Sequence, residues 1–319
     1  MAEFRILGPL EVTAGGEPLP LSGQKQRALL ALLLLDANRV VSTDRLVDAL
    51  WGGQPPRTAA TSLQNFVSQL RKLLGPETLV TKPPGYLLRI EPEELDLERF
   101  RRLVEEARSE PPDARAAKLR KALDLWRGPP LADLEFETFA QSEIGRLEEL
   151  RLAVVEDRID AELQAGRHGE IVGELEAFTD EHPLRERPRG QLMLALYRSG
   201  RQAEALQIYH DTRRVLVEEL GIDPSPALQQ LHGAILRQDA SLDTGSTVRP
   251  SGDDRLADVA ETLLAGRLVP VLGADVADLT TRLAERFEYP ANGDTLPRVA
   301  QYIAVMKGSG PLYDELHSL

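Results

Sequence analysis

The sequence predicts a multidomain protein with three parts. These are an α+β winged helix-turn-helix domain at residues 1–91, an all-α domain of tetratricopeptide (TPR)-like helical repeats at residues 92–240, and a short α/β fragment at residues 255–319. Short apolar runs alternate with three helical patterns in the first part, and a short motif of the second part returns once, 34 residues later. A Ser/Thr/Gly/Asp-rich run at residues 241–254 is typical of a flexible linker.

The composition excludes several classes of protein. The chain has no cysteine, which excludes disulfides, thiolate metal sites and cysteine nucleophiles and is typical of the cytoplasm. The apolar runs fall short of the roughly 20 residues of a membrane span, and the start lacks a signal-peptide pattern. The five histidines are scattered without metal-ligand spacing. We therefore predict a cytoplasmic, non-enzymatic protein without cofactor or membrane partner.

Charge is distributed unevenly along the chain. The net charge is −13, yet residues 1–91 contain 10 Lys+Arg and 8 Asp+Glu, whereas residues 92–319 contain 28 and 43. Neutralisation of phosphates supplies most of the non-specific affinity for DNA, so only the first segment suits contact with nucleic acid. The acidic remainder is expected to face other partners.

The first part begins with short strands and a buried helix. Residues 4–13 are predicted to form two β segments broken at Gly8-Pro9, and residues 14–17 (A-G-G-E) a hairpin turn, since paired glycines supply positive φ. Residues 19–21 (L-P-L) are predicted to return as an edge strand. Ser22 should cap a helix at residues 24–38 that is too rich in leucine for a one-sided stripe, which places it at the domain centre.

Two more helices and a β-ribbon complete this domain. Residues 40–41 are a short extended step, and residues 42–44 (S-T-D) cap a helix at residues 45–51. After a Gly- and Pro-rich break, a third helix covers residues 58–74. Two strands, at residues 78–81 and 86–90, then enclose a P-P-G turn and predict the wing of a winged helix.

The helix at residues 58–74 carries the main functional signal. Its apolar residues form one stripe, and the opposite face holds short polar side chains and cations without an acidic residue. Amides and hydroxyls can contact base edges, while Arg and Lys hold phosphates. The predicted base contacts are Thr58, Thr61, Gln64, Asn65 and Ser68, and the predicted phosphate and wing contacts are Arg57, Arg71, Lys72, Lys82, Tyr86 and Arg89. An ordinary solvated helix face is the alternative.

The second part is helical by pattern and contains a repeat. Amphipathic runs cover residues 96–109, 113–127 and 136–165. The A-G-R of residues 165–167 returns as S-G-R at residues 199–201, 34 residues later, which is the TPR period. Ala205 and Tyr209 have the spacing of the small and aromatic residues of a TPR second helix. Val217 stands where a terminal proline is expected, so a plain stack of helical hairpins is the alternative.

These features resemble a known family. Residues 3–90 resemble the DNA-binding domain of OmpR/PhoB-type response regulators, on the V-S-Q-L-R-K-L of residues 67–73 and the P-G-Y of residues 84–86. The start F-R-I-L-G-P-L-E-V, the L-W-R-G-P-P-L of residues 125–131 and the E-L-G-I-D-P-S-P of residues 219–226 extend the resemblance. Together they resemble the SARP family of actinobacterial antibiotic regulatory activators, which carry a bacterial transcriptional activator domain.

The resemblance implies a sequence-specific transcriptional activator of secondary-metabolite (antibiotic) genes. Two protomers would bind side by side on direct repeats in promoter DNA and recruit the RNA polymerase holoenzyme through its σ subunit and α C-terminal domain. The helix at residues 58–74 would be the recognition helix. The loop before it would touch polymerase, with the contact on Gly53, Gln54, Pro55 and Pro56. Trp51 ends an amphipathic helix and is therefore predicted to be tucked into the core.

The last segment resembles the opening of a SIR2-like NAD-binding domain. A predicted strand at residues 268–272 leads through Gly273-Ala274 into a helix, a geometry that presents backbone N–H groups to phosphate. Asp275 replaces the second glycine, and about 65 residues are too few for a dinucleotide fold, so we expect a truncated or degenerate fragment. Two alternatives to an activator remain: an NAD-handling SIR2-like enzyme with a DNA-binding N-terminal module, and a repeat scaffold that does not bind DNA.

Overall fold

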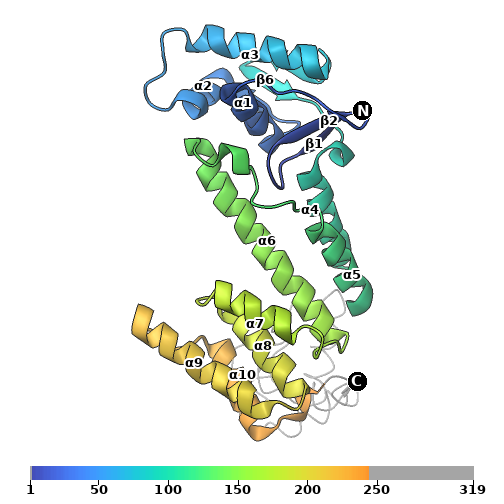
Figure 1. Cartoon of the computed structure of the whole chain (residues 1–319), viewed down its shortest axis with the longest axis vertical. Coiled ribbons are helices and arrows are strands. Elements are labelled where there is room, and N and C mark those ends of the chain that lie inside the picture. The colour runs from blue at the N-terminus through green and yellow to red at the C-terminus, as the bar shows by residue number, and fades with distance from the viewer. Residues whose placement is uncertain (1, 244–319) are drawn as a thin grey trace, which may run out of the picture. The chain divides into compact units, whose positions relative to one another are not determined.

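Residues 2–243 are described in the computed structural model (Figure 1). Their first part combines two small antiparallel sheets with three helices. In chain order these elements are β1 (Ala2–Arg5), β2 (Glu11–Ala14), β3 (Glu17–Pro18), α1 (Gln24–Leu35), β4 (Val40–Ser42), α2 (Thr43–Trp51), α3 (Ala59–Leu74), β5 (Leu79–Lys82) and β6 (Gly85–Leu88). The predicted α/β fragment at residues 255–319 and the linker prediction beyond residue 243 lie outside the described residues.

The first sheet confirms the predicted hairpin. β1, β2 and β3 are antiparallel neighbours in that order, and Ala14 pairs with Glu17 across the turn. Gly15 and Gly16 have φ angles of 61° and 87°, which suit glycine and match the twist of the strands. The predicted edge strand at residues 19–21 is wrong. The tight turn returns the chain at once, so the third strand is β3, two residues earlier.

α1 is the buried centre of this part, as its run of leucines predicts. Eight of its 12 residues are buried, so the helix is covered on most sides. Ser22 is not its cap, because Gly23 takes that position with a φ of 91° and the Ser22 N–H and hydroxyl both donate to Gln26 Oε1. The helix ends at Leu35 rather than at residue 38, and Asn38 turns the chain with a φ of 63°.

The second sheet carries the wing. β6 lies between β4 and β5, and both pairings are antiparallel. β5 and β6 therefore form the predicted β-ribbon, with its turn between Lys82 and Gly85. Gly85 pairs with Ser42 so closely that a Cβ at position 85 would lie 1.9 Å from the Val41 carbonyl oxygen, so only glycine fits there.

α2 connects the two sheets to α3. The Ser42 hydroxyl caps α2 by accepting a hydrogen bond from the Arg45 N–H at 3.2 Å, as predicted. At the other end of α2, Trp51 is half-buried and stacks on Phe66 of α3 with 6.4 Å between ring centroids. Both rings pack against the hydrophobic core, which confirms the prediction that Trp51 is tucked inward.

The second part is helical throughout. Its elements are η1 (Pro92–Glu94), α4 (Asp96–Ala107), α5 (Pro112–Leu123), η2 (Ala132–Leu134), α6 (Thr138–Gln164), α7 (Val172–Glu181), α8 (Glu186–Arg198), α9 (Gln202–Leu220), α10 (Pro226–Arg237) and η3 (Ala240–Leu242). α7, α8 and α9 pack on one another in order, and α10 packs on α8 and α9. This arrangement is consistent with TPR-like repeats. Ala205 is fully buried, and Tyr209 stacks on His232 of α10 at 3.9 Å.

Two hydrophobic cores are present in the described residues. The first combines apolar side chains of α1 and both sheets with Phe100, Trp126 and Leu134 of the helical part. The second is built by the C-terminal end of α6, from Ile159 onward, together with side chains of α7 to α10. The first core therefore continues across residue 91, where the sequence motifs change.

A buried carboxylate joins the two sides of residue 91. Asp96, the first residue of α4, is 3% exposed, and its carboxylate accepts hydrogen bonds from the N–H groups of Ile6 and Leu7 at 2.9–3.0 Å. The Arg127 N–H in turn donates to the Leu7 carbonyl oxygen at 2.8 Å. Burial raises the pKa of Asp96 above its ordinary value, against the lowering effect of these N–H donors and of the Arg127 charge.

Asp96→Ala should lower the free energy of unfolding by about 1–3 kcal/mol, because it leaves the N–H groups of Ile6 and Leu7 without their acceptor. Urea unfolding followed by circular dichroism measures the change. The matched control is Asp124→Ala, which removes an exposed carboxylate and should change stability by less than about 0.5 kcal/mol. Equal effects of the two substitutions would contradict the assigned role of Asp96.

Candidate nucleic-acid interface

α3 separates an apolar face from a polar one. Leu63, Val67 and Leu70 are buried in the first core, and Figure 1 shows α1 and α2 on the inner side of the helix. The residues predicted to contact bases are all exposed: Thr58, Thr61, Gln64, Asn65 and Ser68. Thr58 precedes the first turn rather than opening the helix, because α3 begins at Ala59. The outward face carries no carboxylate, and a helix of this kind has the dimensions to enter a major groove.

Four of the residues predicted to contact phosphates are exposed, two of them near the ends of α3 and two on the wing strands or directly after them. Arg57 lies in the loop before α3, and Lys72 lies in its last turn. Lys82 ends β5 at the tip of the wing, and Arg89 directly follows β6. Cations at both ends of a recognition helix and on the wing are placed where the DNA backbones run beside a groove.

The structure places Arg71 and Tyr86 differently from the prediction. Arg71 Nε donates to the Leu79 carbonyl oxygen at 2.7 Å, and its Nη2 donates to the Thr81 hydroxyl at 2.6 Å. The same guanidinium lies 6.0 Å from the centre of the Tyr86 ring, and Tyr86 is only 9% exposed because it is part of the core. Arg71 therefore joins α3 to the wing, and the Tyr86 ring packs in the core.

One candidate residue was missed from sequence. Gln69 is exposed on α3, and on a helical wheel it lies about 40° from Asn65. Its amide could pair with an adenine edge as well as that of Gln64 or Asn65. The sequence signal that could have identified Gln69 was a polar residue at the boundary between the outward face and the apolar stripe of the helix.

The loop between α2 and α3 is exposed along its length. Gly53, Gln54, Pro55 and Pro56 are all open to solvent. The loop leaves α2 at Gly52, which has a φ of 68°, and it rejoins α3 where the Ala59 N–H donates to the Pro56 carbonyl oxygen at 2.9 Å. The Trp51 ring, stacked on Phe66, fixes the end of α2 from which the loop leaves, so the start of the loop that carries Gln54 is held in place.

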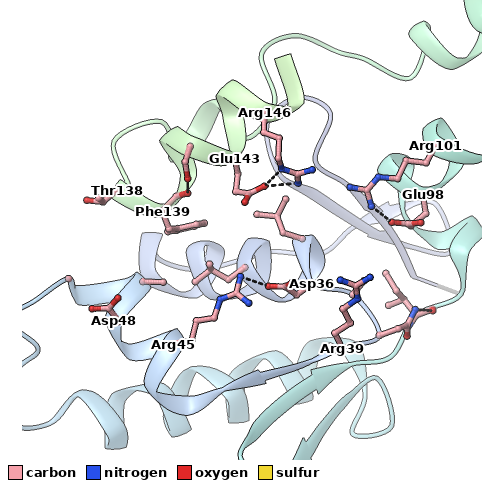
Figure 2. Close-up of a pocket in the computed structure, with 18 of the residues that line it drawn as sticks. Asp36, Arg39, Arg45, Asp48, Glu98, Arg101, Thr138, Phe139, Glu143 and Arg146 are labelled. Atoms are coloured by element: carbon pink, nitrogen blue, oxygen red, sulfur yellow. Dashed lines mark hydrogen bonds and ion pairs between the residues drawn. The ribbon is translucent and has the colours of Figure 1, made fainter. Parts of the chain in front are cut away.

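A polar cleft borders this loop. It has a volume of about 990 Å³ and is lined by the C-terminal end of α1, by α2 with Gly52 and Gly53, and by parts of α4 and α6. Figure 2 shows its charged side chains turned toward the space, most of them as local ion pairs. These pairs are Asp36–Arg45, Glu98–Arg101 and Glu143–Arg146, at 2.6–2.8 Å. Because these arginines already face carboxylates, the cleft is poorly suited to bind phosphate.

Comparison with protein families agrees with this geometry. Residues 16–88 match the family described as "Transcriptional regulatory protein, C terminal", and residues 95–236 match the "Bacterial transcriptional activator domain". The regulatory protein DnrI of Streptomyces peucetius is 39% identical over 264 residues, which are 78% of this chain and 97% of DnrI. The chain belongs to the SARP family of transcriptional regulators.

Other SARP relatives are longer. The regulatory protein AfsR of Streptomyces coelicolor is 46% identical over 286 residues, covering 88% of this chain but 28% of AfsR. The chain thus spans about a quarter of the length of the AfsR proteins that it matches. A solved structure of Mycobacterium tuberculosis EmbR in complex with a low-affinity phosphopeptide superposes with a TM-score of 0.72 at 38% identity, over 84% of this chain and 72% of EmbR.

In this SARP protein the two matched ranges lie on either side of residue 91, the boundary that the Asp96 hydrogen bonds cross. The first ends with β6, and the second begins at Leu95, one residue before Asp96. The first contains α3, the loop before it and the wing. Within residues 2–243, no helix is both long enough and apolar enough to cross a membrane.

Arg71→Ala should destabilise the domain by about 1–2 kcal/mol, because it removes two hydrogen bonds between α3 and the wing. The neighbouring Lys72→Ala is the control, since Lys72 is exposed, and it should stay within about 0.5 kcal/mol of the wild type. Chemical unfolding of both variants decides the point. If Lys72→Ala proves as destabilising as Arg71→Ala, the assigned roles of these two cations are wrong.

Proposed function

We propose that this SARP protein is a sequence-specific, DNA-binding transcriptional activator. The observation that carries the proposal is the exposed, carboxylate-free face of α3, with cations at both ends and a wing beside it. The segment that bears this face is also the part of the chain with a small positive charge, in a protein whose net charge is −13. Its affinity for random DNA is therefore expected to be modest, and sequence readout contributes a large share.

In the proposed complex, α3 lies in the major groove. Thr61, Gln64, Asn65, Ser68 and the added Gln69 contact base edges, with Thr58 near the N-terminal end of the helix. Arg57, Lys72, Lys82 and Arg89 hold phosphates. Asn and Gln side chains in this position favour adenine, because the amide N–H can donate to N7 while the amide oxygen accepts a hydrogen bond from the N6 amino group, in a bidentate pair.

We further propose that two protomers bind side by side on direct repeats in a promoter and recruit RNA polymerase. The exposed loop at residues 53–56 lies directly before α3, so it remains accessible beside a bound groove. Its two prolines limit the freedom lost on contact. The σ subunit and the α C-terminal domain are the proposed partners on the holoenzyme. The protein would act in the cytoplasm on secondary-metabolite genes, as its SARP membership suggests.

Asn65→Ala should cost about 1–3 kcal/mol at the specific site and relax preference at one base position. Lys72→Ala should instead weaken specific and random DNA alike and reduce the slope of log K against log salt by about 1. Gel-shift titrations on a site selected from a random DNA pool, and on random duplex, measure both effects. Identical behaviour of the two variants on the two duplexes would remove the division between readout and phosphate contact.

Gln54→Ala should lower promoter-dependent transcription while operator affinity stays within about twofold, because Gln54 is exposed outside the recognition helix. A run-off transcription assay beside a gel-shift titration on the same promoter makes the comparison. Arg57→Ala, three residues further along, serves as the contrast and should lower affinity and transcription together. A parallel loss of both activities in Gln54→Ala would assign the loop to the DNA-binding surface.

A further inference from the structure

Phe136 is the most exposed large apolar side chain among the described residues. It is 84% exposed, whereas the others in this class, such as Leu236 at 56%, are leucines, valine and isoleucine of the helical part. Single exposed aliphatic residues are common on protein surfaces. A bare phenyl ring is less so, and aromatic residues are enriched in the buried centres of protein–protein interfaces. The sequence pattern placed Phe136 in a helix, but α6 begins only at Thr138.

The turn that carries Phe136 is ordered on both sides. Leu134 and Ala140 are fully buried in the first core, and the Glu137 N–H donates to the Leu134 carbonyl oxygen at 2.9 Å. The Glu137 carboxylate is 13% exposed and pairs with Lys25 Nζ of α1 at 2.9 Å. The phenyl ring is thus held toward solvent by its neighbours, so a partner would lose little of its binding energy in ordering it.

The same lysine connects this turn to the end of α2. Lys25 Nζ also donates to the Leu50 carbonyl oxygen at 2.6 Å, three residues before the exposed loop at residues 53–56 begins. Thr138 lines the same cleft as Gly52 and Gly53, and Figure 2 shows Thr138 of α6 and Asp48 of α2 at one end of it. Lys25 therefore links the turn that carries Phe136 to the end of α2, which leads into the loop at residues 53–56, although about 80 residues separate the turn and the loop in sequence.

The surroundings of Phe136 are acidic. Residues 131–145 contain four carboxylates and no lysine or arginine. Asp133 and Glu137 are paired with cations of α1, and Glu143 is paired with Arg146, whereas Glu135, which precedes Phe136 in sequence, is exposed. Asp48 on α2 is exposed as well. Such a surface repels phosphate and favours a protein that offers an apolar pocket bordered by basic side chains.

We propose that Phe136 is the aromatic anchor of a composite polymerase-contact surface, in which the helical part completes the loop at residues 53–56. Its partner is a surface of the RNA polymerase holoenzyme with an apolar pocket edged by lysine or arginine, and Glu135 faces that basic edge. This inference rests on the proposed function, since it assumes that α3 holds the protein at a promoter.

The test uses Phe136→Ala in the full chain, with Leu236→Ala as an exposed apolar control on α10. Phe136→Ala should lower run-off transcription and the affinity of purified holoenzyme for the DNA-bound protein by about tenfold. Its operator affinity and urea midpoint should match the wild type, because the ring makes no contribution to the core. Leu236→Ala should leave all four measurements unchanged.

A charge reversal tests the electrostatic half of the proposal. Glu135→Lys should weaken holoenzyme binding several-fold, with the loss diminishing at high salt, whereas Glu181→Lys, at an exposed site on α7, should not.

The outcomes distinguish failure of the Phe136 anchor from failure of the proposed function. If Phe136→Ala activates transcription within twofold of the wild type, or loses operator affinity in step with transcription, the anchor is refuted, and in the second case the ring serves DNA or a neighbouring protomer. If the wild-type chain selects no sequence from a random DNA pool, the proposed function fails and the anchor fails with it.

Discussion

The carboxylate of Asp96 is the contact on which the arrangement of the N-terminal half depends. It accepts hydrogen bonds from consecutive backbone N–H groups, Ile6 and Leu7, at the end of the first strand of the molecule, and it does so from the first residue of α4. An anion at a helix N-terminus is also favoured by the helix dipole. This one side chain therefore ties the strand that opens the winged helix to the helical part that follows it.

α1 adds further contacts between the winged helix and the helical part. It is buried on most sides, yet two of its cationic side chains form ion pairs with the helical part. Arg27 pairs with Asp133, and Lys25 pairs with Glu137. Partly exposed ion pairs contribute only about 0.2–1 kcal/mol each, so their main effect is on position rather than stability. The apolar side chains of the first core supply the energy, and the charged pairs decide how the turn before α6 sits beside the end of α2. Because these ion pairs set the position of that turn, the winged helix and the helical part together form one surface there.

Two opposing demands act on α3. Its apolar stripe must be buried to stabilise the domain, and in the proposed complex its polar face must stay free for bases. Arg71 sits at the boundary and is used for structure, since it bonds the wing strand and lies over the Tyr86 ring. Lys72, its neighbour, is left exposed. The wing is thereby held in a fixed position relative to α3. The proposed DNA contacts require this, because α3 and the wing would bind adjacent segments of DNA.

Local pattern in the sequence determined most of the elements and the outward face of α3. The leucines of α1, the paired glycines of the first hairpin and the 3.6-residue period of α3 act within a few residues, so each could be predicted from its own segment. The exposed positions Gln64, Asn65 and Ser68 follow from the same period. Motif order was enough to indicate the SARP family. The predictions were wrong where two neighbouring residues could both fill one structural position. For example, Gly23 is the N-cap of α1 instead of the predicted Ser22.

Contacts between distant segments were decided only by the tertiary structure. Nothing near Asp96 in sequence indicates that its partners are Ile6 and Leu7, and nothing near Arg71 indicates whether it faces DNA or the wing. Phe136 has the apolar character of a core residue, and only the tertiary structure shows that its ring is left in solvent while the neighbouring Glu137 pairs with Lys25. Hydrophobic periodicity specifies which face of an element is apolar. Which partner covers that face, and which side chain remains uncovered, depends on the packing of the whole chain.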